Sequence, residues 1–148
     1  MKKYRFQVSI NRPPSDVFPF LEETEKQALY SDVPMRLITK GPMRTGSKME
    51  VSMGSGLMKA TLGLEMVDVE KDRKLAYKTY SGPIDWQGEY RLEPTEDGGT
   101  AVTHEGSMTF HGLWRLAEPL VGGELRSSGA KEMERMKSAV ESSAKTDS

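Results

Sequence analysis

The chain has 148 residues, a formal net charge of -1 and no cysteine. This length suits one domain with a single buried core, so we expect residues 1–148 to form one. The balanced, interleaved charge excludes the basic surface of a nucleic-acid-binding protein. The lack of cysteine excludes disulfides, thiolate nucleophiles and cysteine-ligated metals.

The sequence opens on a predicted strand. From Lys3 to Ile10, apolar residues alternate with polar ones, which places Tyr4, Phe6 and Val8 on one face with Ile10. No apolar run of a signal peptide precedes this strand. No later stretch is long and apolar enough to cross a bilayer. We therefore expect a cytoplasmic protein that does not span a membrane.

Two short helices are predicted after the first strand. Pro14 suits a first helical position, and Asp16 is favourable near a helix N-terminus. Pro19 removes an internal hydrogen bond, so the first helix should be short or kinked. Residues 22–30 can form the second helix, which ends before Pro34.

From Met35 to Phe110, short runs of strand-forming residues alternate with turns rich in glycine, proline and charged residues. Each run keeps its apolar residues on one face, which is typical of half-buried strands. Thr95 to Gly99 has the composition of a tight hairpin. Short turns between successive strands predict antiparallel pairing. The predicted strands are 35–40, 48–53, 57–69, 75–79, 84–92 and 100–110.

The last predicted element is one long helix from Leu113 to about Glu141. Apolar residues at helical spacing form a stripe along it, and charged residues occupy the opposite face. The stripe consists of Leu113, Leu116, Leu120, Leu125, Met133, Met136 and Val140. Residues 142–148 are polar and are expected to form a frayed tail.

Pro119 and the pair Gly122-Gly123 lie within this predicted helix and can break or kink it. Such a break is either a packing adjustment or a gate that admits a ligand.

Together these elements predict an α+β fold, in which a curved antiparallel sheet of about seven strands wraps around the long C-terminal helix. The helix is the only element broad enough to cover the apolar face of such a sheet. The two short helices follow the first strand.

Several segments resemble the START-like superfamily, also called SRPBCC, which has the helix-grip fold. They are the opening segment 8–18, the turn at Gly46, and the segments 90–94, 99–103 and 136–141. The similarity is greatest to the branch for polyketide cyclase/dehydrase and lipid transport. It runs nearly the whole length of the chain, and its motifs mark the fold rather than a reaction.

This resemblance implies a hollow between sheet and helix that holds an apolar small molecule. Related branches include lipid carriers, coenzyme-Q-binding proteins, aromatase/cyclases, hormone receptors and chaperone co-activators. Fold alone does not choose among these functions.

Three residues on predicted inward faces combine an apolar body with a polar group. Trp86 and Tyr90 are either core aromatics or walls of a cavity that stack on a flat ligand. His104 is either a hydrogen-bonded core histidine or a group that orients a ligand or donates a proton. The ten methionines either fill an irregular core or line a cavity that adapts to its ligand.

No catalytic motif occurs in the sequence. Gly54-Ser55-Gly56 lacks the third glycine and the following helix of a dinucleotide loop, and no nucleophile elbow is present. His104 and His111, the only histidines, have opposite strand parity, which argues against a metal site. We expect no cofactor. The carboxylates Asp85, Glu89, Glu93 and Glu105 should face solvent.

The leading hypothesis is a protein that binds a small hydrophobic molecule, which by the resemblance is a lipid, a quinone or a polyketide-like compound. The expected lining is Met58, Leu62, Leu64, Trp86, Tyr90, His104, Met108, Leu116 and Leu120. One alternative is a cyclase/dehydratase-type enzyme that uses His104. Another is a protein-interaction module without an open cavity. The small molecule is the expected partner, and the chain is expected to be a monomer or a homodimer.

Overall fold

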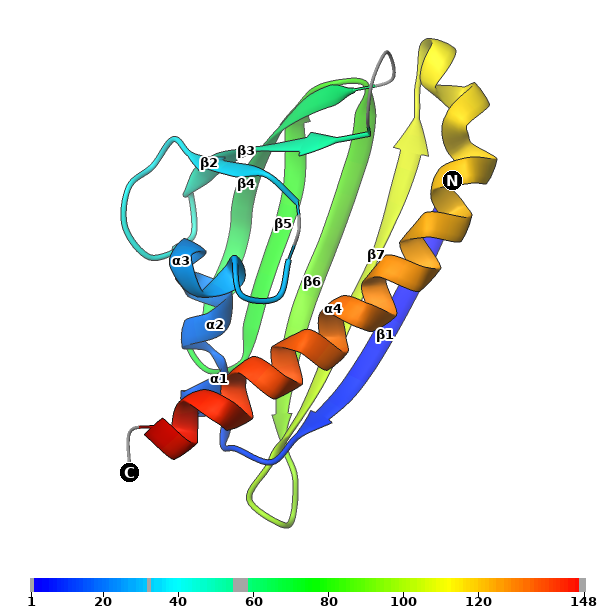
Figure 1. Ribbon diagram of the computed structural model, residues 1–148. Helices are drawn as coiled ribbons and strands as arrows, with labels where there is room; N and C mark the ends of the chain where they lie inside the picture. Colours follow the sequence, from blue (N-terminus) through cyan, green and yellow to red (C-terminus); the bar gives the residue numbers. More distant parts are fainter. Residues whose placement is uncertain (1, 32, 55–58, 147–148) are drawn as a thin grey trace.

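The computed structural model describes residues 2–31, 33–54 and 59–146, with residues 120–125 and 144–146 described by their backbone alone. Within these ranges it contains one seven-stranded sheet and a long helix, α4 (Glu118–Thr146), that crosses one face of the sheet (Figure 1). This is the predicted α+β helix-grip architecture.

All neighbouring strands pair antiparallel, in the order β1-β7-β6-β5-β4-β3-β2. Only the β1–β7 pair is distant in sequence. Its register joins Tyr4 to Gly106 and Phe6 to His104. The strands are β1 (Lys2–Ile10), β2 (Met35–Leu37), β3 (Lys48–Met53), β4 (Ala60–Glu70), β5 (Lys74–Ser81), β6 (Ile84–Pro94) and β7 (Thr100–Phe110).

Local chemistry explains the turns and the curvature. Gly98 adopts a φ of +84° in the β6–β7 hairpin, a conformation that favours glycine. The pairing of β4 with β5 shifts register after Gly63 and again between Met66 and Asp68. Such irregularities bend a strand and increase its twist, so they help the sheet to curve around α4.

Three single-turn helices follow β1, one more than predicted: α1 (Pro14–Val17), α2 (Pro19–Glu22) and α3 (Thr24–Gln27). The predicted shortness of the first helix is confirmed, since α1 ends before Pro19. The predicted loss of an internal hydrogen bond is not, since Pro19 is the first residue of α2. α1, α2 and Phe18 between them contribute Val17, Phe18, Phe20 and Leu21 to the buried core, whereas α3 buries no residue.

The long helix begins later and ends later than predicted. Residues 112–117 form a 3-10 helix, η2 (Gly112–Ala117), on which Leu113 and Leu116 are exposed. α4 begins at Glu118 and continues through Gly122-Gly123 to Thr146, so no break occurs at those glycines and the helix extends into the predicted tail. Pro19 and Pro119 both lie in a first helical turn, where a missing N–H removes no internal hydrogen bond.

The C-terminal half of α4 closes the core. Met133, Met136 and Val140 are buried and belong to one apolar cluster with residues from the short helices and the sheet. Gly129, which lies nearer the N-terminal end of α4, packs against β1. A Cβ at this position would lie 2.2 Å from the ring of Phe6. The glycine therefore permits the close approach of α4 to β1.

Candidate functional site

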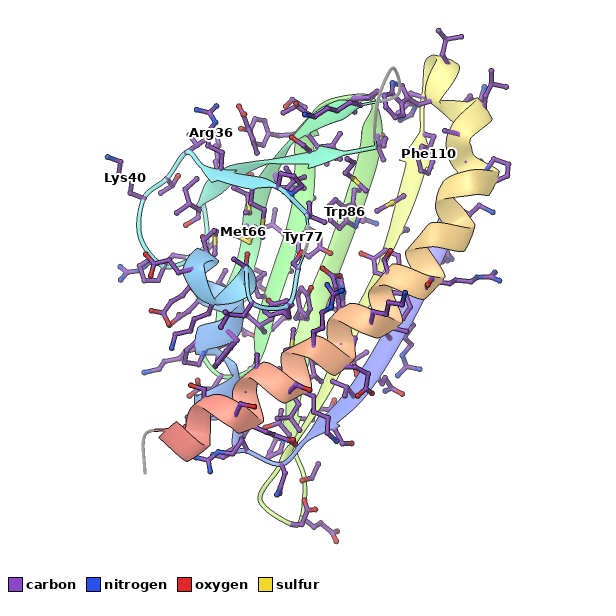
Figure 2. The ribbon with its side chains drawn as sticks, viewed as in Figure 1. Arg36, Lys40, Met66, Tyr77, Trp86 and Phe110 are labelled. Atoms are coloured by element: carbon purple, nitrogen blue, oxygen red, sulfur yellow. The ribbon has the colours of Figure 1, made fainter. Side chains whose placement is uncertain are left out.

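A cavity of about 520 Å³ lies between the sheet and α4. Its apolar walls include five of the ten methionines, namely Met35, Met49, Met53, Met66 and Met108. Polar and charged residues from α3, from the segment after it and from α4 also line it, among them Gln27, Ser31, Ser128 and Lys131. Figure 2 shows Met66, Tyr77 and Trp86 along the stretch of sheet beside α4.

The strand register builds the floor of this cavity. One row across the sheet reads Tyr4, Gly106, Gly88 and Tyr77 on β1, β7, β6 and β5. The two glycines leave the middle of the row without side chains. The tyrosines lean over them from both sides, and their hydroxyl oxygens meet 3.0 Å apart. A Cβ on either glycine would lie within 2.8 Å of the Tyr4 hydroxyl.

The next row places His104 beside this tyrosine pair. His104 pairs with Phe6 on one side and Tyr90 on the other. Its Nε2 lies 2.6 Å from the Tyr77 hydroxyl and 3.4 Å from that of Tyr4. Trp86 Nε1 donates a hydrogen bond to the Tyr4 hydroxyl over 2.7 Å. The Tyr90 ring stacks on the imidazole with centroids 3.9 Å apart.

We call Tyr4, Tyr77, Trp86, Tyr90 and His104 the aromatic cluster; all five line the cavity. Burial lowers the pKa of His104 from 6.5 to about 3, so its imidazole is neutral at neutral pH. Burial likewise raises the pKa of Tyr4, and it raises the pKa of Tyr77 and of Tyr90 well above 10. The cluster therefore offers neutral hydrogen-bonding groups on an apolar wall.

The structure places the predicted lining residues as follows. Leu64, Trp86, Tyr90, His104 and Met108 line the cavity. Leu62 is fully buried but does not line the cavity. Its side chain packs against the β5–β6 turn, where its Cδ2 would lie 2.6 Å from a Cβ on Gly82. Leu116 is 79% exposed on η2, since α4 begins after it. Met58 and the side chain of Leu120 lie outside the described residues.

Several lining residues were not predicted. Tyr4 and Tyr77 have inward strand parity, and the inward glycines on β6 and β7 indicate that there is room beside them. The contact between the two tyrosine hydroxyls, however, depends on the strand register, which the sequence does not show. Tyr30, whose hydroxyl donates to the Phe20 carbonyl oxygen over 2.9 Å, lines the cavity from the segment after α3. Gly129 lines it from α4. Neither position could be found from strand alternation.

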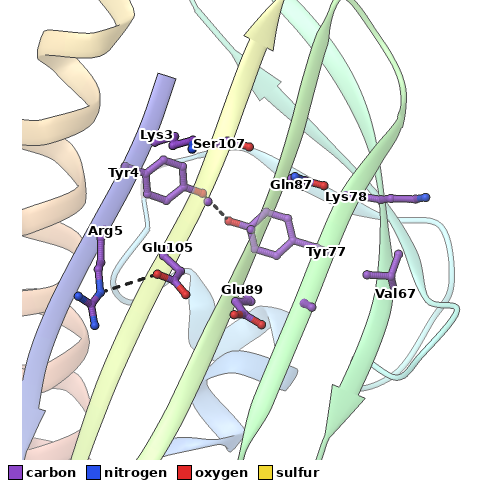
Figure 3. Close-up of a pocket in the computed structure, with 13 residues that line it drawn as sticks. Lys3, Tyr4, Arg5, Val67, Tyr77, Lys78, Gln87, Glu89, Glu105 and Ser107 are labelled. Carbon is purple, nitrogen blue, oxygen red and sulfur yellow. Dashed lines mark hydrogen bonds and ion pairs between the residues drawn. The ribbon is translucent and has the colours of Figure 1, made fainter. Parts of the chain in front are cut away.

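A second hollow, of about 660 Å³, lies on the opposite face of the sheet (Figure 3). Outward-facing residues of both charges line it, and Arg5 forms an ion pair with Glu105 at 3.7 Å. It is larger but open, and its mixed charge suits an ordinary solvated surface better than an apolar ligand. The inner cavity, which contains buried polar groups, is the candidate site.

No metal centre is visible in the part of the chain that the structure describes, since no three of its His, Asp or Glu residues gather. His111 instead lies at the surface, where its Nε2 is 2.7 Å from an oxygen of Asp85. Two other carboxylates that were predicted to face solvent also lie at the surface. Glu89 forms an ion pair with Arg91, and Glu93 is exposed. Among the described helices, none is long and apolar enough to span a bilayer.

Solved structures with the same architecture span almost the whole chain. A protein from Thermus thermophilus, TTHA0849, superposes with a TM-score of 0.78 at 13% identity, covering 96% of this chain and 99% of that one. The Zhui aromatase/cyclase from a Streptomyces species gives 0.72 at 13% identity, covering 95% and 93%. MLL2253 from Mesorhizobium loti gives 0.69 at 17%, covering 95% and 97%. At these identities the likeness shows the fold alone.

Comparison at the level of sequence gives two results. No curated protein matches the chain significantly. The model of one protein family, described as polyketide cyclase/dehydrase and lipid transport, matches residues 1–141. The chain therefore belongs to the polyketide cyclase/dehydrase and lipid transport family.

Proposed function

We propose that residues 1–148 act as one domain that binds a small, uncharged and largely apolar molecule, of the lipid, quinone or polyketide-like class, in the cavity beneath α4. The observation that carries this proposal is the combination of methionine-rich walls with a neutral aromatic cluster. Ligand pockets typically pair such apolar walls with a few convergent polar groups that fix orientation. The family description is consistent with a ligand of this kind.

Binding is favoured over acid–base catalysis by the state of His104. A general acid or base works best when its pKa lies near the working pH. The buried imidazole has a pKa of about 3, and the described residues place no carboxylate within hydrogen-bonding distance of it. These properties suit a hydrogen-bonding group better than a proton-transfer catalyst. The open cavity also weighs against a protein-interaction module with a filled core.

The first test identifies the bound molecule. Freshly purified protein is extracted with organic solvent, and the extract is analysed by mass spectrometry. A near-stoichiometric apolar compound is expected. An empty extract, from a protein that also fails to bind an apolar fluorescent dye, would contradict the proposal.

The second test locates the binding to the cavity. Ser128 is exposed on α4 and lines the cavity, so Ser128→Trp places a large ring there with little effect on folding. Dye affinity should fall by about tenfold or more, the effect of about 1.4 kcal/mol. The matched control is Ser127→Trp, since Ser127 is exposed on the same helix and does not line the cavity. Equal dye affinities in the two variants would place the dye elsewhere.

A further inference from the structure

Four groups of the aromatic cluster form a continuous hydrogen-bonded chain. Trp86 Nε1 lies 2.7 Å from the Tyr4 hydroxyl, which lies 3.0 Å from the Tyr77 hydroxyl. The Tyr77 hydroxyl lies 2.6 Å from Nε2 of His104. Each hydroxyl supplies one hydrogen, and a neutral imidazole carries one hydrogen on either Nδ1 or Nε2. The distances alone leave two possible directions for the chain.

The indole removes this ambiguity, because its N–H can only donate. Tyr4 accepts that hydrogen, so its own hydrogen is available to Tyr77. Tyr77 then donates to Nε2 of His104, which must be the unprotonated nitrogen. In this direction the indole hydrogen and both hydroxyl hydrogens have acceptors within the chain. The imidazole hydrogen is on Nδ1, where it is left for an acceptor in the cavity. Which ring nitrogen of a histidine is protonated is generally set by the hydrogen bond that the other ring nitrogen makes.

The opposite direction leaves a buried donor without an acceptor. If Nε2 carried the hydrogen, it would donate to Tyr77, and Tyr77 would donate to Tyr4. Tyr4 would then accept twice, from Tyr77 and Trp86, and its own hydrogen would find no acceptor among the hydrogen bonds of the described residues. A buried, unsatisfied hydroxyl hydrogen is unfavourable.

Nδ1 of His104 is the end of the chain that a ligand can reach. His104 is only 7% exposed, yet it lines the cavity. Among the described residues, no hydrogen bond involves its Nδ1, and Nδ1 is also absent from the fully buried polar atoms without a partner. This nitrogen therefore opens onto the cavity, beside the stacked Tyr90 ring.

We propose that the Trp86 indole directs this hydrogen-bond chain so that His104 presents Nδ1–H to the cavity, and that the site consequently prefers a planar ligand whose buried end carries a carbonyl oxygen. The ligand preference rests on the proposed binding function, whereas the protonation of His104 does not. A carbonyl oxygen accepts from Nδ1–H, while a ligand that can only donate leaves two hydrogens facing each other. Such a mismatch discriminates more strongly than a change in apolar shape.

The protonation of His104 is tested first, on the ligand-free protein, by the ¹⁵N chemical shifts of its ring in NMR. The only other histidine is His111, so a His111→Gln variant assigns the signals. The expected result is a protonated Nδ1 and an unprotonated Nε2 at pH 7. A protonated Nε2 would overturn the proposal. Trp86→Phe should yield a mixture of the two forms, whereas Trp114→Phe, at the other tryptophan, should leave the Nδ1–H form intact.

The ligand preference is tested with two flat three-ring probes of nearly equal shape. 9-Fluorenone has a carbonyl acceptor and no donor, and carbazole has an N–H donor and no oxygen. Fluorenone should bind at least about tenfold more tightly, since an unsatisfied buried donor is costly, and Trp86→Phe should reduce this ratio towards one. Equal binding, or tighter binding of carbazole, would overturn the preference. Failure of both probes to bind, with a protonated Nδ1, would contradict the proposed function and leave the assignment of His104 supported.

Discussion

At the scale of single residues, two glycines decide whether the aromatic cluster can form. Gly88 and Gly106 occupy inward positions of β6 and β7, where strand alternation otherwise places large side chains. A Cβ on Gly88 would meet the hydroxyls of Tyr77 and Tyr4 at 2.7 and 2.8 Å, which are the ends of side chains that can move. A Cβ on Gly106 would meet the backbone oxygen of Gln87 at 2.4 Å, which cannot move without the strand.

This difference predicts an order of stabilities. Gly88→Ala should destabilise the fold by about 1–3 kcal/mol, the usual cost of overpacking, and should break the contact between the two tyrosine hydroxyls. Gly106→Ala should cost more, because β6 and β7 must separate locally. Urea denaturation measures both. Ser107→Ala, at the neighbouring position on the outer face, should stay within about 0.5 kcal/mol of the wild type. A smaller loss for Gly106→Ala than for Gly88→Ala would contradict the argument.

Alternation alone predicted part of the cavity wall, including three residues of the aromatic cluster, but not the contacts that join the cluster. Trp86, Tyr90 and His104 alternate with outward carboxylates, which was enough to place them on the inner face. Their contacts with Tyr4 and Tyr77 depend on which strands are neighbours and on their register. The β1–β7 pairing joins residues about a hundred positions apart, and no local pattern encodes it.

At the scale of elements, the sequence predicted the strands more accurately than the start of the long helix. Leu113 and Leu116 continue the apolar spacing of the helix, yet both are exposed on η2. Periodicity does not distinguish an α-helix from the 3-10 turns that often precede one. The position of Pro119 within the predicted helix indicated that it can break or kink the helix. It lies instead in the first turn of α4, where proline is well tolerated.

The contact between α4 and β1 supports a prediction about Gly129. Alanine raises helix propensity by about 1 kcal/mol relative to glycine. Here, however, its Cβ would lie 2.2 Å from the Phe6 ring, so α4 would have to lift from the sheet. Gly129→Ala should therefore destabilise the fold by about 1–3 kcal/mol, as measured by urea denaturation. Ser127→Ala, exposed on the same helix, should be neutral or slightly stabilising.

A double variant tests the cause of that loss. Phe6→Ala removes the ring that the new Cβ would meet. If the clash causes the destabilisation, adding Gly129→Ala to Phe6→Ala should cost nothing or stabilise the protein through helix propensity. Equal losses in both backgrounds would show that the ring is not responsible.

At the scale of the whole molecule, His104 couples folding to pH. Its pKa falls from 6.5 to about 3 on burial, so between these values the unfolded chain binds a proton that the folded protein does not. Stability should therefore fall with decreasing pH in this window, by about 1.4 kcal/mol per pH unit from this residue. His104→Gln removes the effect. The stability difference between wild type and this variant should shrink from pH 7 to pH 5, and a constant difference would show that His104 does not titrate on unfolding.

The cavity also sets a condition on the whole fold. If its 520 Å³ were empty and dry, a cost of about 24 cal/mol per Å³ would give roughly 12 kcal/mol, comparable with the entire stability of a typical domain. The cavity must therefore hold water or a ligand, or its flexible methionine side chains must close into it. A bound apolar ligand would be part of what keeps the native protein stable.

Removal of the ligand should consequently lower the thermal stability. Calorimetry of protein stripped by organic extraction or reverse-phase adsorption should show a lower Tm than untreated protein. An apolar probe at a hundred times its Kd should restore about 2.7 kcal/mol, a shift of about 2–8 °C for a domain of this size. The probe should raise the Tm of Ser128→Trp only weakly, whereas it should raise the Tm of Ser127→Trp as much as that of the wild type. Identical melting of stripped, untreated and probe-treated protein would mean that no apolar ligand binds, and that water fills the cavity or the methionines close it, since a ligand that binds the folded state must stabilise it.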